Sequence, residues 1–442
     1  MAEASELIST PSQLRDRFAA AGKPPDAFAV GVEHEKIGVL AADDRSPVPY
    51  HGQGGTIASL LDAFLADGWE AVREDGFAIA LARGPDKITL EPGGQLELSG
   101  IPARTAHEAA AEIRAHLAEL GQRSAPLGIR WLGLGFRPFG TLDAIEWVPK
   151  RRYVVMRDLL PKRGRHALDM MKRTATVQAN LDWSDVDDAG KKFRAAMGVT
   201  SIVTALYACS PLVEGQDSGY QSFRARAWLE TDPDRCGLLP FAFEEGDVFE
   251  RYTEWALDVP MLFLYRDGYR RVDGITFRRF LREGFQGERA SFADWDVHLS
   301  TLFPEARLKH YLEVRGADAG PLPSVLALAA LWRGLLYDGE ALRQTLELTH
   351  GLSMAERESL RAEVPRGGLR TPVLGRTAGD LARELIAIAR AGLVRLGQDE
   401  APLLDPLAEI AATGRSAADR VLDVWKAARG DARVFADTFA VA

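Results

Sequence analysis

Five glutamates stand at alternating positions in three short segments of the sequence, and their spacing suggests metal chemistry. They are Glu33, Glu35, Glu91, Glu97 and Glu313. Successive side chains of a β-strand point to opposite faces, so glutamates two residues apart share a face. Few lysines lie near them, so converging carboxylates would need a cation between them. Mg²⁺ combines a few carboxylates with phosphate oxygens and water. The spacing therefore predicts a Mg²⁺–nucleotide site on an open antiparallel sheet.

Two segments, one of them new and the other the segment of Glu313, place further polar side chains on one strand face. In RTATVQANLDW, every second residue is polar, Gln178 and Asn180 among them, and the residues between are apolar. We call each such set of alternate residues a parity of the strand. In HYLEVRG, Glu313 and Arg315 share a face opposite Leu312. A guanidinium beside a metal-binding carboxylate suits a phosphoryl group, because its planar donors stabilise developing negative charge. We therefore expect Arg315 to face a transferred phosphate.

Neither solvent-facing strands nor the common nucleotide-binding motifs explain these segments as well as a metal–nucleotide site does. An antiparallel strand with one solvent-exposed face would explain any one of the segments, but it explains all four together less well. The sequence has no G-x-x-x-x-G-K-[ST] loop and no strand–GxGxxG–helix unit, and it lacks a G-x-S-x-G elbow. These absences disfavour a P-loop NTPase, a dinucleotide-dependent dehydrogenase and an α/β-hydrolase. The eight histidines show no metal-ligand spacing.

A basic and aromatic segment in the middle of the chain could hold an acidic substrate. SFRARAWLETDPDRCGLLPF contains Arg224, Arg235 and Trp228 in a region rich in turn-forming residues. Arginine suits a bidentate grip on the α-carboxylate of an amino acid. For Arg235, a salt bridge to Asp232 or Asp234 is the favoured alternative.

Composition limits the class of protein. The 442 residues carry a formal charge of −9 and are 46% hydrophobic, which favours a large globular core and disfavours nucleic acid as a partner. Two cysteines are too few for a disulfide framework and are expected to be packing residues in a reducing compartment. The start of the chain lacks the pattern of a secretory signal, and the apolar stretches are shorter than a membrane span. We therefore expect a cytoplasmic protein without membrane association.

The periodicity predicts the elements that position these side chains. Strands are expected at 29–40, 87–99, 174–183 and 309–316, the second interrupted by a turn at Pro92-Gly93-Gly94. Helices are expected at 6–21, 57–65, 106–120 with Gly121 as its cap, 190–208, 324–337, 379–396, 402–412 and 417–428. The sequence thus predicts one catalytic domain over 1–442, with the sheet in about 26–320 and a helical layer in about 321–442.

Long segments of the sequence resemble the plant and proteobacterial type of glutamate–cysteine ligase. They are GVEHEK at 31–36, LEPGGQLELSG at 90–100, LDMMKRTATVQANLDW at 168–183, TDPDRCGLLPF at 231–241, ALDVPM at 256–261 and FPEARLKHYLEVRGAD at 303–318. The resemblance implies an α+β, glutamine synthetase-like fold, in which an antiparallel β-sheet funnel has helices packed outside and a helical C-terminal layer. It also implies ATP as co-substrate and two or three Mg²⁺.

The resemblance implies a reaction and roles for the residues above. ATP would phosphorylate the γ-carboxylate of L-glutamate, and the amine of L-cysteine would displace the phosphate, which is the first step of glutathione synthesis. Glu313 and Arg315 are then expected to be catalytic, Asn180 and Arg315 to contact the nucleotide, and Arg224, Arg235 and Trp228 to bind substrate. The metal ligands implied are Glu33, Glu35, Glu91, Glu97, Gln178 and Glu313.

Three alternatives remain open at this point. The nearest is a related γ-glutamyl or carboxylate–amine ligase with another acceptor, for example in ergothioneine synthesis. A non-catalytic binding protein on the same fold is disfavoured because all five acidic positions are filled. A simple ATP hydrolase is disfavoured because basic, substrate-binding segments accompany the acidic strands. A monomer or a homodimer is expected.

Overall fold

A computed structural model describes residues 6–266, 268–272 and 274–442 of the chain. Within these residues nine strands form one sheet with antiparallel pairings throughout. Its order is β14 (Ala306–Leu308), β15 (Leu312–Val314), β7 (Val177–Leu181), β1 (Val30–Leu40), β5 (Leu96–Ser99), β4 (Asp86–Leu90), β3 (Phe77–Arg83) and β2 (Glu70–Glu74), with β6 (Ile129–Leu132) also pairing with β1.

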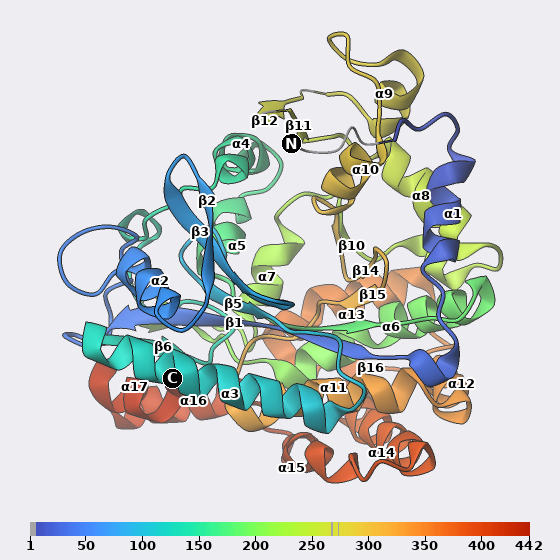
Figure 1. Cartoon of the computed structure of the whole chain (residues 1–442). Coiled ribbons are helices and arrows are strands. Elements are labelled where there is room, and N and C mark those ends of the chain that lie inside the picture. Colours follow the sequence, from blue (N-terminus) through green and yellow to red (C-terminus); the bar gives the residue numbers. More distant parts are fainter. Residues whose placement is uncertain (1–5, 267, 273) are drawn as a thin grey trace.

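Helices cover one face of this sheet and surround the other. Figure 1 shows α3 and α11 against the lower face, the C-terminal helices beneath them, and α4, α9 and α10 above the sheet. The helices of the first 320 residues are α1 (Ser12–Ala20), α2 (Ile57–Leu65), α3 (Ala106–Ser124), α4 (Arg151–Leu159), α5 (Ala167–Arg173), α6 (Val186–Tyr207), α7 (Phe223–Leu229), α8 (Val248–Asp258), α9 (Phe277–Glu283) and α10 (Phe292–Leu299).

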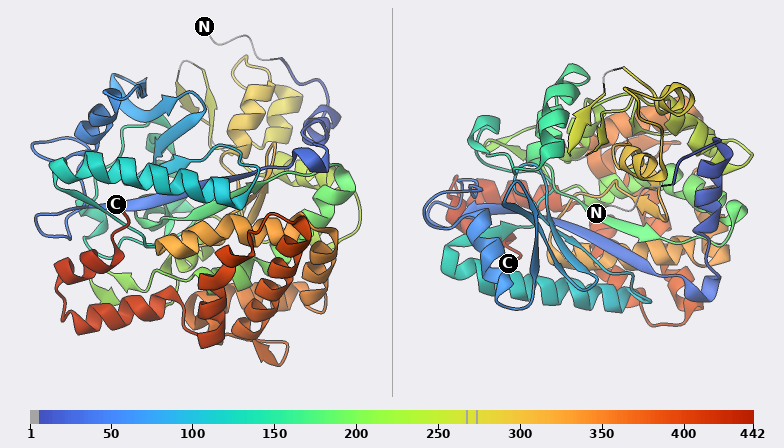
Figure 2. Two further views of the ribbon diagram at one scale, coloured as in Figure 1. Left: turned by 60° about the horizontal axis from the view of Figure 1, so that its bottom comes forward. Right: turned by 45° about the horizontal axis from the view of Figure 1, so that its top comes forward.

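The C-terminal part forms the helical layer that the sequence predicts. It comprises α11 (Leu322–Leu336), α12 (Gly339–Leu348), α13 (Met354–Gly367), α14 (Ala378–Leu396), α15 (Asp405–Thr413), α16 (Ala417–Ala427) and α17 (Ala432–Phe439). Figure 2 shows these helices packed together along one side of the molecule. Helices α12, α13 and α17 were not predicted individually.

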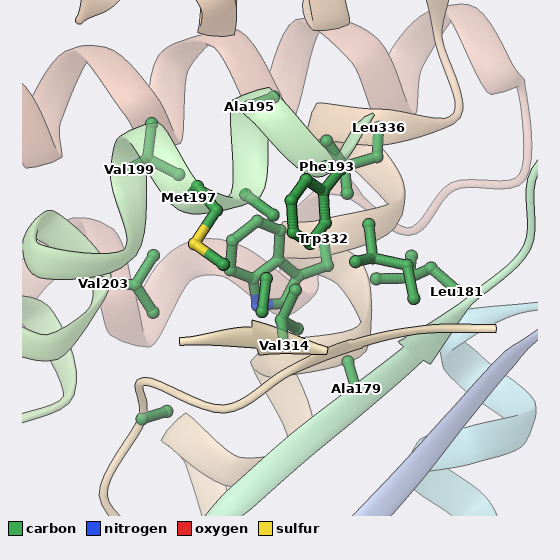
Figure 3. Packing of buried hydrophobic residues seen from close by; sticks show 14 of the residues in the cluster. Ala179, Leu181, Phe193, Ala195, Met197, Val199, Val203, Val314, Trp332 and Leu336 are labelled. Carbon is green, nitrogen blue, oxygen red and sulfur yellow. The ribbon is translucent and has the colours of Figure 1, made fainter. Parts of the chain in front are cut away.

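Apolar side chains from the strands and from both helical regions pack into three hydrophobic clusters among the described residues, the largest of which contains residues from Ile8 to Ala411. In Figure 3, Trp332 of α11 lies among Phe193 and Met197 of α6 and the strand residues Leu181 and Val314. All five are buried. The apolar parity of each predicted strand is therefore the one that faces the helices, which leaves the polar parity for the opposite face. Both cysteines are free thiols, and Cys209 is buried in the packing.

Several predicted boundaries differ from those observed, for physical reasons. The first helix begins at Ser12 because the chain before it is extended, with a bridge between Leu7 and Ser291. Helix α3 passes through Gly121 and ends at Ser124. The strand expected at 87–99 is two strands joined by the predicted turn. That turn requires glycine twice, because a Cβ at Gly93 would overlap the carbonyl oxygen of Lys172 and Gly94 has φ +79°.

One buried histidine makes the stability of the fold depend on pH. His298 of α10 is 2% exposed, its Nε2 lies 2.8 Å from the carbonyl oxygen of Ala256, and Nδ1 has no hydrogen-bond partner among the described residues. Burial lowers its pKa to about 4, and the nearby Arg235 acts in the same direction. Because the folded pKa lies below the unfolded one, this contribution to stability is present above the unfolded value of about 6.5 and is lost as the pH falls.

We therefore expect a His298→Gln variant to depend less on pH than the wild type. Glutamine can still donate to Ala256, but it does not take up a proton when the chain unfolds. Between pH 7 and pH 5 the wild type should lose about 2 kcal/mol more free energy of unfolding than the variant. Urea denaturation at the two pH values measures this difference, and equal losses would contradict it.

Candidate active site

Strand register brings the predicted acidic side chains together. In the β1–β5 pair, Glu35 lies opposite Glu97, and in the β1–β7 pair Glu33 lies opposite Gln178. The β15–β7 pair places Glu313 opposite Asn180. These residues share the sheet face that points away from α3 and α11, so segments far apart in the sequence contribute to one polar surface.

This surface lines a cavity of about 330 Å³. We call it the catalytic cavity. Of the predicted site residues, it is lined by Glu33, Glu35, Glu91, Glu97, Gln178, Arg224, Trp228 and Arg315. Glu313, Asn180 and Arg235 are not among its lining residues. A smaller recess of about 30 Å³ shares Arg224, Trp228 and Arg315 with the cavity.

The four glutamates of the cavity wall are held where negative charge is unfavourable. Burial, followed by repulsion from Glu313 and Glu97, raises the pKa of Glu33 to about 7. Burial and the neighbouring carboxylates of Glu91 and Glu97 raise the pKa of Glu35 well above its usual range. Burial also raises the pKa of both Glu91 and Glu97. A cavity wall of this kind favours a bound cation.

Neutral donors fix the orientation of these carboxylates. The two oxygens of Glu33 accept hydrogen bonds of 3.0 Å from the side-chain amides of Gln178 and Asn180. Glu97 accepts from the hydroxyls of Thr89 at 2.6 Å and Ser99 at 2.9 Å. Asn180 thus reaches the site through Glu33, and its own Oδ1 has no hydrogen-bond partner in the described structure.

Glu313 differs from the other four because three cationic side chains surround it. Its Oε1 accepts from Arg307 at 2.8 Å and from Lys309 at 3.0 Å, and its Oε2 accepts from Arg315 at 2.5 Å. Burial alone would raise the pKa of Glu313, but these three cations hold it well below its usual range. Glu313 is fully buried. In this arrangement it is a counter-ion that holds Arg315, whose guanidinium also donates to Gln178 at 2.7 Å.

The sequence shows few lysines near the glutamates, but the fold brings further cations to them. Lys150, Arg152, Arg307 and Lys309 also line the catalytic cavity. Alternation along RLKHYLEVR could have revealed two of them, since Arg307 and Lys309 have the same parity as Glu313 and Arg315. Lys150 and Arg152 lie at the start of α4, where strand periodicity gives no signal.

Arg224 and Trp228 line the cavity from the same face of α7, four residues apart. The Arg224 side chain is buried and its Nη2 donates to the carbonyl oxygen of Arg315 at 2.8 Å. Its Nη1 lies 3.8 Å from Asp318, which accepts hydrogen bonds from the hydroxyls of Ser210 and Ser222. Burial lowers the pKa of Arg224, which leaves a desolvated guanidinium for an anionic ligand.

The structure does not place Arg235 in the site. Its Nε donates to Asp232 at 2.6 Å, and its other nitrogens donate to the carbonyl oxygens of Pro260 at 2.9 Å and Thr301 at 3.3 Å. The salt bridge to Asp232, the favoured alternative, is therefore the one observed. A guanidinium satisfied in this way ties the 231–237 loop to neighbouring segments and is not available to bind substrate.

No three His, Cys, Asp or Glu side chains within 6–266, 268–272 and 274–442 are arranged as a metal-binding group. The chemistry of the cavity wall nonetheless fits a hard cation, because four carboxylates with raised pKa values share it. The presence of Mg²⁺ and the number of ions stay predictions.

Comparisons with known proteins identify the family. Residues 29–437 match the glutamate–cysteine ligase family 2 (GCS2). The chain belongs to this family. It is 42% identical over 412 residues to the chloroplastic glutamate–cysteine ligase of Arabidopsis thaliana, covering 92% of this chain and 78% of that protein. It is 41% identical over 408 residues to the chloroplastic glutamate–cysteine ligase B of Oryza sativa subsp. japonica, covering 91% and 82%. The predicted family and the prediction of a ligase are confirmed.

A solved structure shows the same fold. The glutamate–cysteine ligase of Francisella tularensis, determined in complex with AMP, matches with a TM-score of 0.57 at 13% identity, covering 93% of this chain and 89% of that one. At this identity the likeness concerns the fold alone. The predicted fold class, an α+β antiparallel sheet with helices outside and a helical C-terminal layer, is confirmed.

The comparisons contradict one prediction. The Arabidopsis thaliana and Oryza sativa relatives are chloroplastic enzymes, which is contrary to the expectation of a cytoplasmic protein. Composition and the first residues of the chain were not a sufficient guide to compartment. Among the described residues, no helix has the length and apolar character needed to cross a membrane.

Proposed function

We propose that this chain joins the γ-carboxylate of L-glutamate to the amine of L-cysteine at the expense of ATP, the first step of glutathione biosynthesis. The family match over residues 29–437 carries this proposal. The catalytic cavity supports it, because a wall of carboxylates beside a cluster of cations suits a metal–triphosphate and an acidic substrate. We also infer one catalytic domain over 1–442, since one hydrophobic cluster contains residues from Ile8 to Ala411.

We assign the acidic wall to Mg²⁺. Glu33, Glu35, Glu91 and Glu97 would supply carboxylate oxygens, with Gln178 as a neutral neighbour. Bound Mg²⁺ would neutralise the phosphate oxygens and favour attack at phosphorus. Glu313 would join this set only by releasing one of its cationic partners. We also propose that Asn180 acts on the metal shell through the carboxylate of Glu33, to which its Nδ2 donates.

We assign the basic wall to the reacting groups. Arg315, held between Glu313 and Gln178, would donate to the phosphoryl group as the γ-carboxylate oxygen of glutamate attacks phosphorus and ADP leaves. Arg224 would hold the α-carboxylate, and Trp228 would pack beside it. The cysteine amine then attacks the acyl carbon of γ-glutamyl phosphate, inorganic phosphate leaves, and the nitrogen loses a proton to give the amide.

ADP release in the presence of ATP, Mg²⁺ and L-glutamate tests this reaction. We expect release to require an acceptor amine, to be supported by L-cysteine and by the similarly sized 2-aminobutyrate, and to match the γ-glutamyl dipeptide formed, measured by mass spectrometry. ADP release at the same rate without an acceptor would indicate a hydrolase and contradict the proposal. A larger amine that outperforms cysteine would indicate a different acceptor.

A further inference from the structure

A second hollow lies beside α7, which carries Arg224, and α13, which carries Arg361. It is outside the catalytic cavity. We call it the basic groove. It has a volume of about 520 Å³, and it is lined from α7, from the end of α13 and from the residues that follow α13. It shares no lining residue with the catalytic cavity. The volume falls within the range of small-molecule sites.

Positive charge predominates in the basic groove. Arg226, Arg366 and Arg370 line it, with Glu363 as the one acidic lining residue among those that the structure describes. Arg226 pairs with Glu230 at 2.5 Å and Arg370 with Asp419 at 3.2 Å. Arg366 is exposed, and no salt bridge to it occurs among the described residues.

Tyr220 organises two of these arginines. The guanidinium carbon of Arg366 lies 5.1 Å from the centre of the Tyr220 ring, and that of Arg226 lies 5.9 Å from it. Hydrogen bonding to Arg366, and then to Arg226, lowers the pKa of Tyr220. Stacking on an aromatic ring fixes a guanidinium plane while leaving donors at its edge, which reduces the entropy lost when it grips an anion.

We propose that the basic groove binds a small oxyanion with two or more negative charges, a polycarboxylate or a phosphate ester. Carboxylate and phosphate oxygens match the guanidinium fork equally well, so the chemistry defines this shared class. One charge would meet Arg366, which has no carboxylate partner in the described part of the chain, and a second would compete with Asp419 for Arg370. The site is distinct from the one that holds ATP and glutamate.

The groove shares its walls with the catalytic side of the molecule. On α7, Arg224 and Trp228 face the catalytic cavity, whereas Arg226 faces the groove. On α13, Arg361 lines the recess beside Arg224, whereas Arg366 lines the groove. A ligand that repositions Arg226 therefore acts on the helix that carries Arg224. This second part rests on the proposed function and predicts a changed KM for glutamate.

Isothermal titration with citrate and, separately, with inorganic pyrophosphate tests binding, with the full chain and without Mg²⁺ or substrates. A variant with Arg366→Ala and Arg370→Ala should bind at least about tenfold more weakly, since each charged hydrogen bond lost contributes about 1.5 kcal/mol or more. The control carries Arg390→Ala and Arg395→Ala, two arginines of α14 that also pair with acids. It should bind like the wild type.

The two probes separate the sources of the anion. Binding of citrate alone identifies a polycarboxylate site and binding of pyrophosphate alone a phosphate site, and either supports the proposal. Binding by neither, or a binding isotherm that is unchanged in the Arg366/Arg370 variant, overturns it. Citrate at saturation should change the KM for glutamate of the wild type and not of that variant. If citrate binds but the KM for glutamate does not change, only the coupling between the basic groove and the helix that carries Arg224 is overturned. If the chain shows no ligase activity, the binding test remains valid.

Discussion

A Glu33→Gln variant should fold, resist heat better than the metal-free wild type, and lose about 100-fold or more of its Mg²⁺-dependent turnover. The loss follows from removing one carboxylate of the proposed metal wall, where even indirect metal contacts account for about 10- to 100-fold. The gain in stability follows because burial and the charges of Glu313 and Glu97 oppose ionisation of Glu33, whose pKa is about 7.

The hydrogen bonds around residue 33 survive the change. One oxygen of the new amide can still accept from Gln178. Its NH₂ group would face Asn180, whose Oδ1 has no partner among the described residues and can turn to accept. The substitution therefore removes a repelled charge, whereas turning the Asn180 amide moves its Nδ2 donor to the side where Oδ1 now has no partner, which reduces the gain without cancelling it.

Thermal unfolding with and without Mg²⁺, together with the ligase assay, checks both halves of this expectation. Mg²⁺ should raise the Tm of the wild type and raise that of Glu33→Gln much less. The matched control is Glu70→Gln, an exposed glutamate on β2 of the same sheet, which should leave both properties unchanged. Full turnover in Glu33→Gln would refute the metal role assigned to this residue.

The acidic half of the site could be predicted from the sequence because it depends on local periodicity. Alternation in GVEHEK and LELS assigns Glu33, Glu35 and Glu97 to one face whatever the order of strands in the sheet. The opposite strand parity also explains why His34 and Lys36 are buried behind the sheet, where Lys36 Nζ lies 2.8 Å from Nε2 of His116. No tertiary information was needed for these assignments.

The basic half depends on packing between distant segments and was therefore mostly missed. Arg152 enters the cavity because α4 packs above the sheet, and nothing in its own neighbourhood distinguishes it from the exposed Arg157. Arg224 and Arg235 look equivalent in sequence. They differ because Asp232 lies three residues before Arg235, whereas the nearest acid to Arg224 is Asp318, almost a hundred residues away. Asp318 therefore stabilises the charge of Arg224, while the Arg224 side chain still lines the cavity.

The two kinds of glutamate in this site should respond in opposite ways to loss of charge. Glu33 is repelled by its surroundings, whereas Glu313 neutralises three cations that are themselves taken out of water. Removing one partner of a buried ion pair leaves an uncompensated charge, which typically costs about 3–5 kcal/mol. Identical Glu→Gln substitutions on two strands of the same sheet therefore separate a ligand-binding carboxylate from a structural counter-ion.

A Glu313→Gln variant should lose about 3–5 kcal/mol of unfolding free energy in the absence of metal, and its turnover should fall because Arg315 is no longer held. Urea denaturation at pH 7.5 measures the first effect and the ligase assay the second. Adding Lys309→Met to this variant removes one of the stranded cations and should recover part of the lost stability, a coupling that a double-mutant cycle isolates. Metal-free stability equal to that of the wild type would contradict the counter-ion role. Because Glu33→Gln shifts stability the other way, a general effect of placing glutamine in this sheet cannot produce both results.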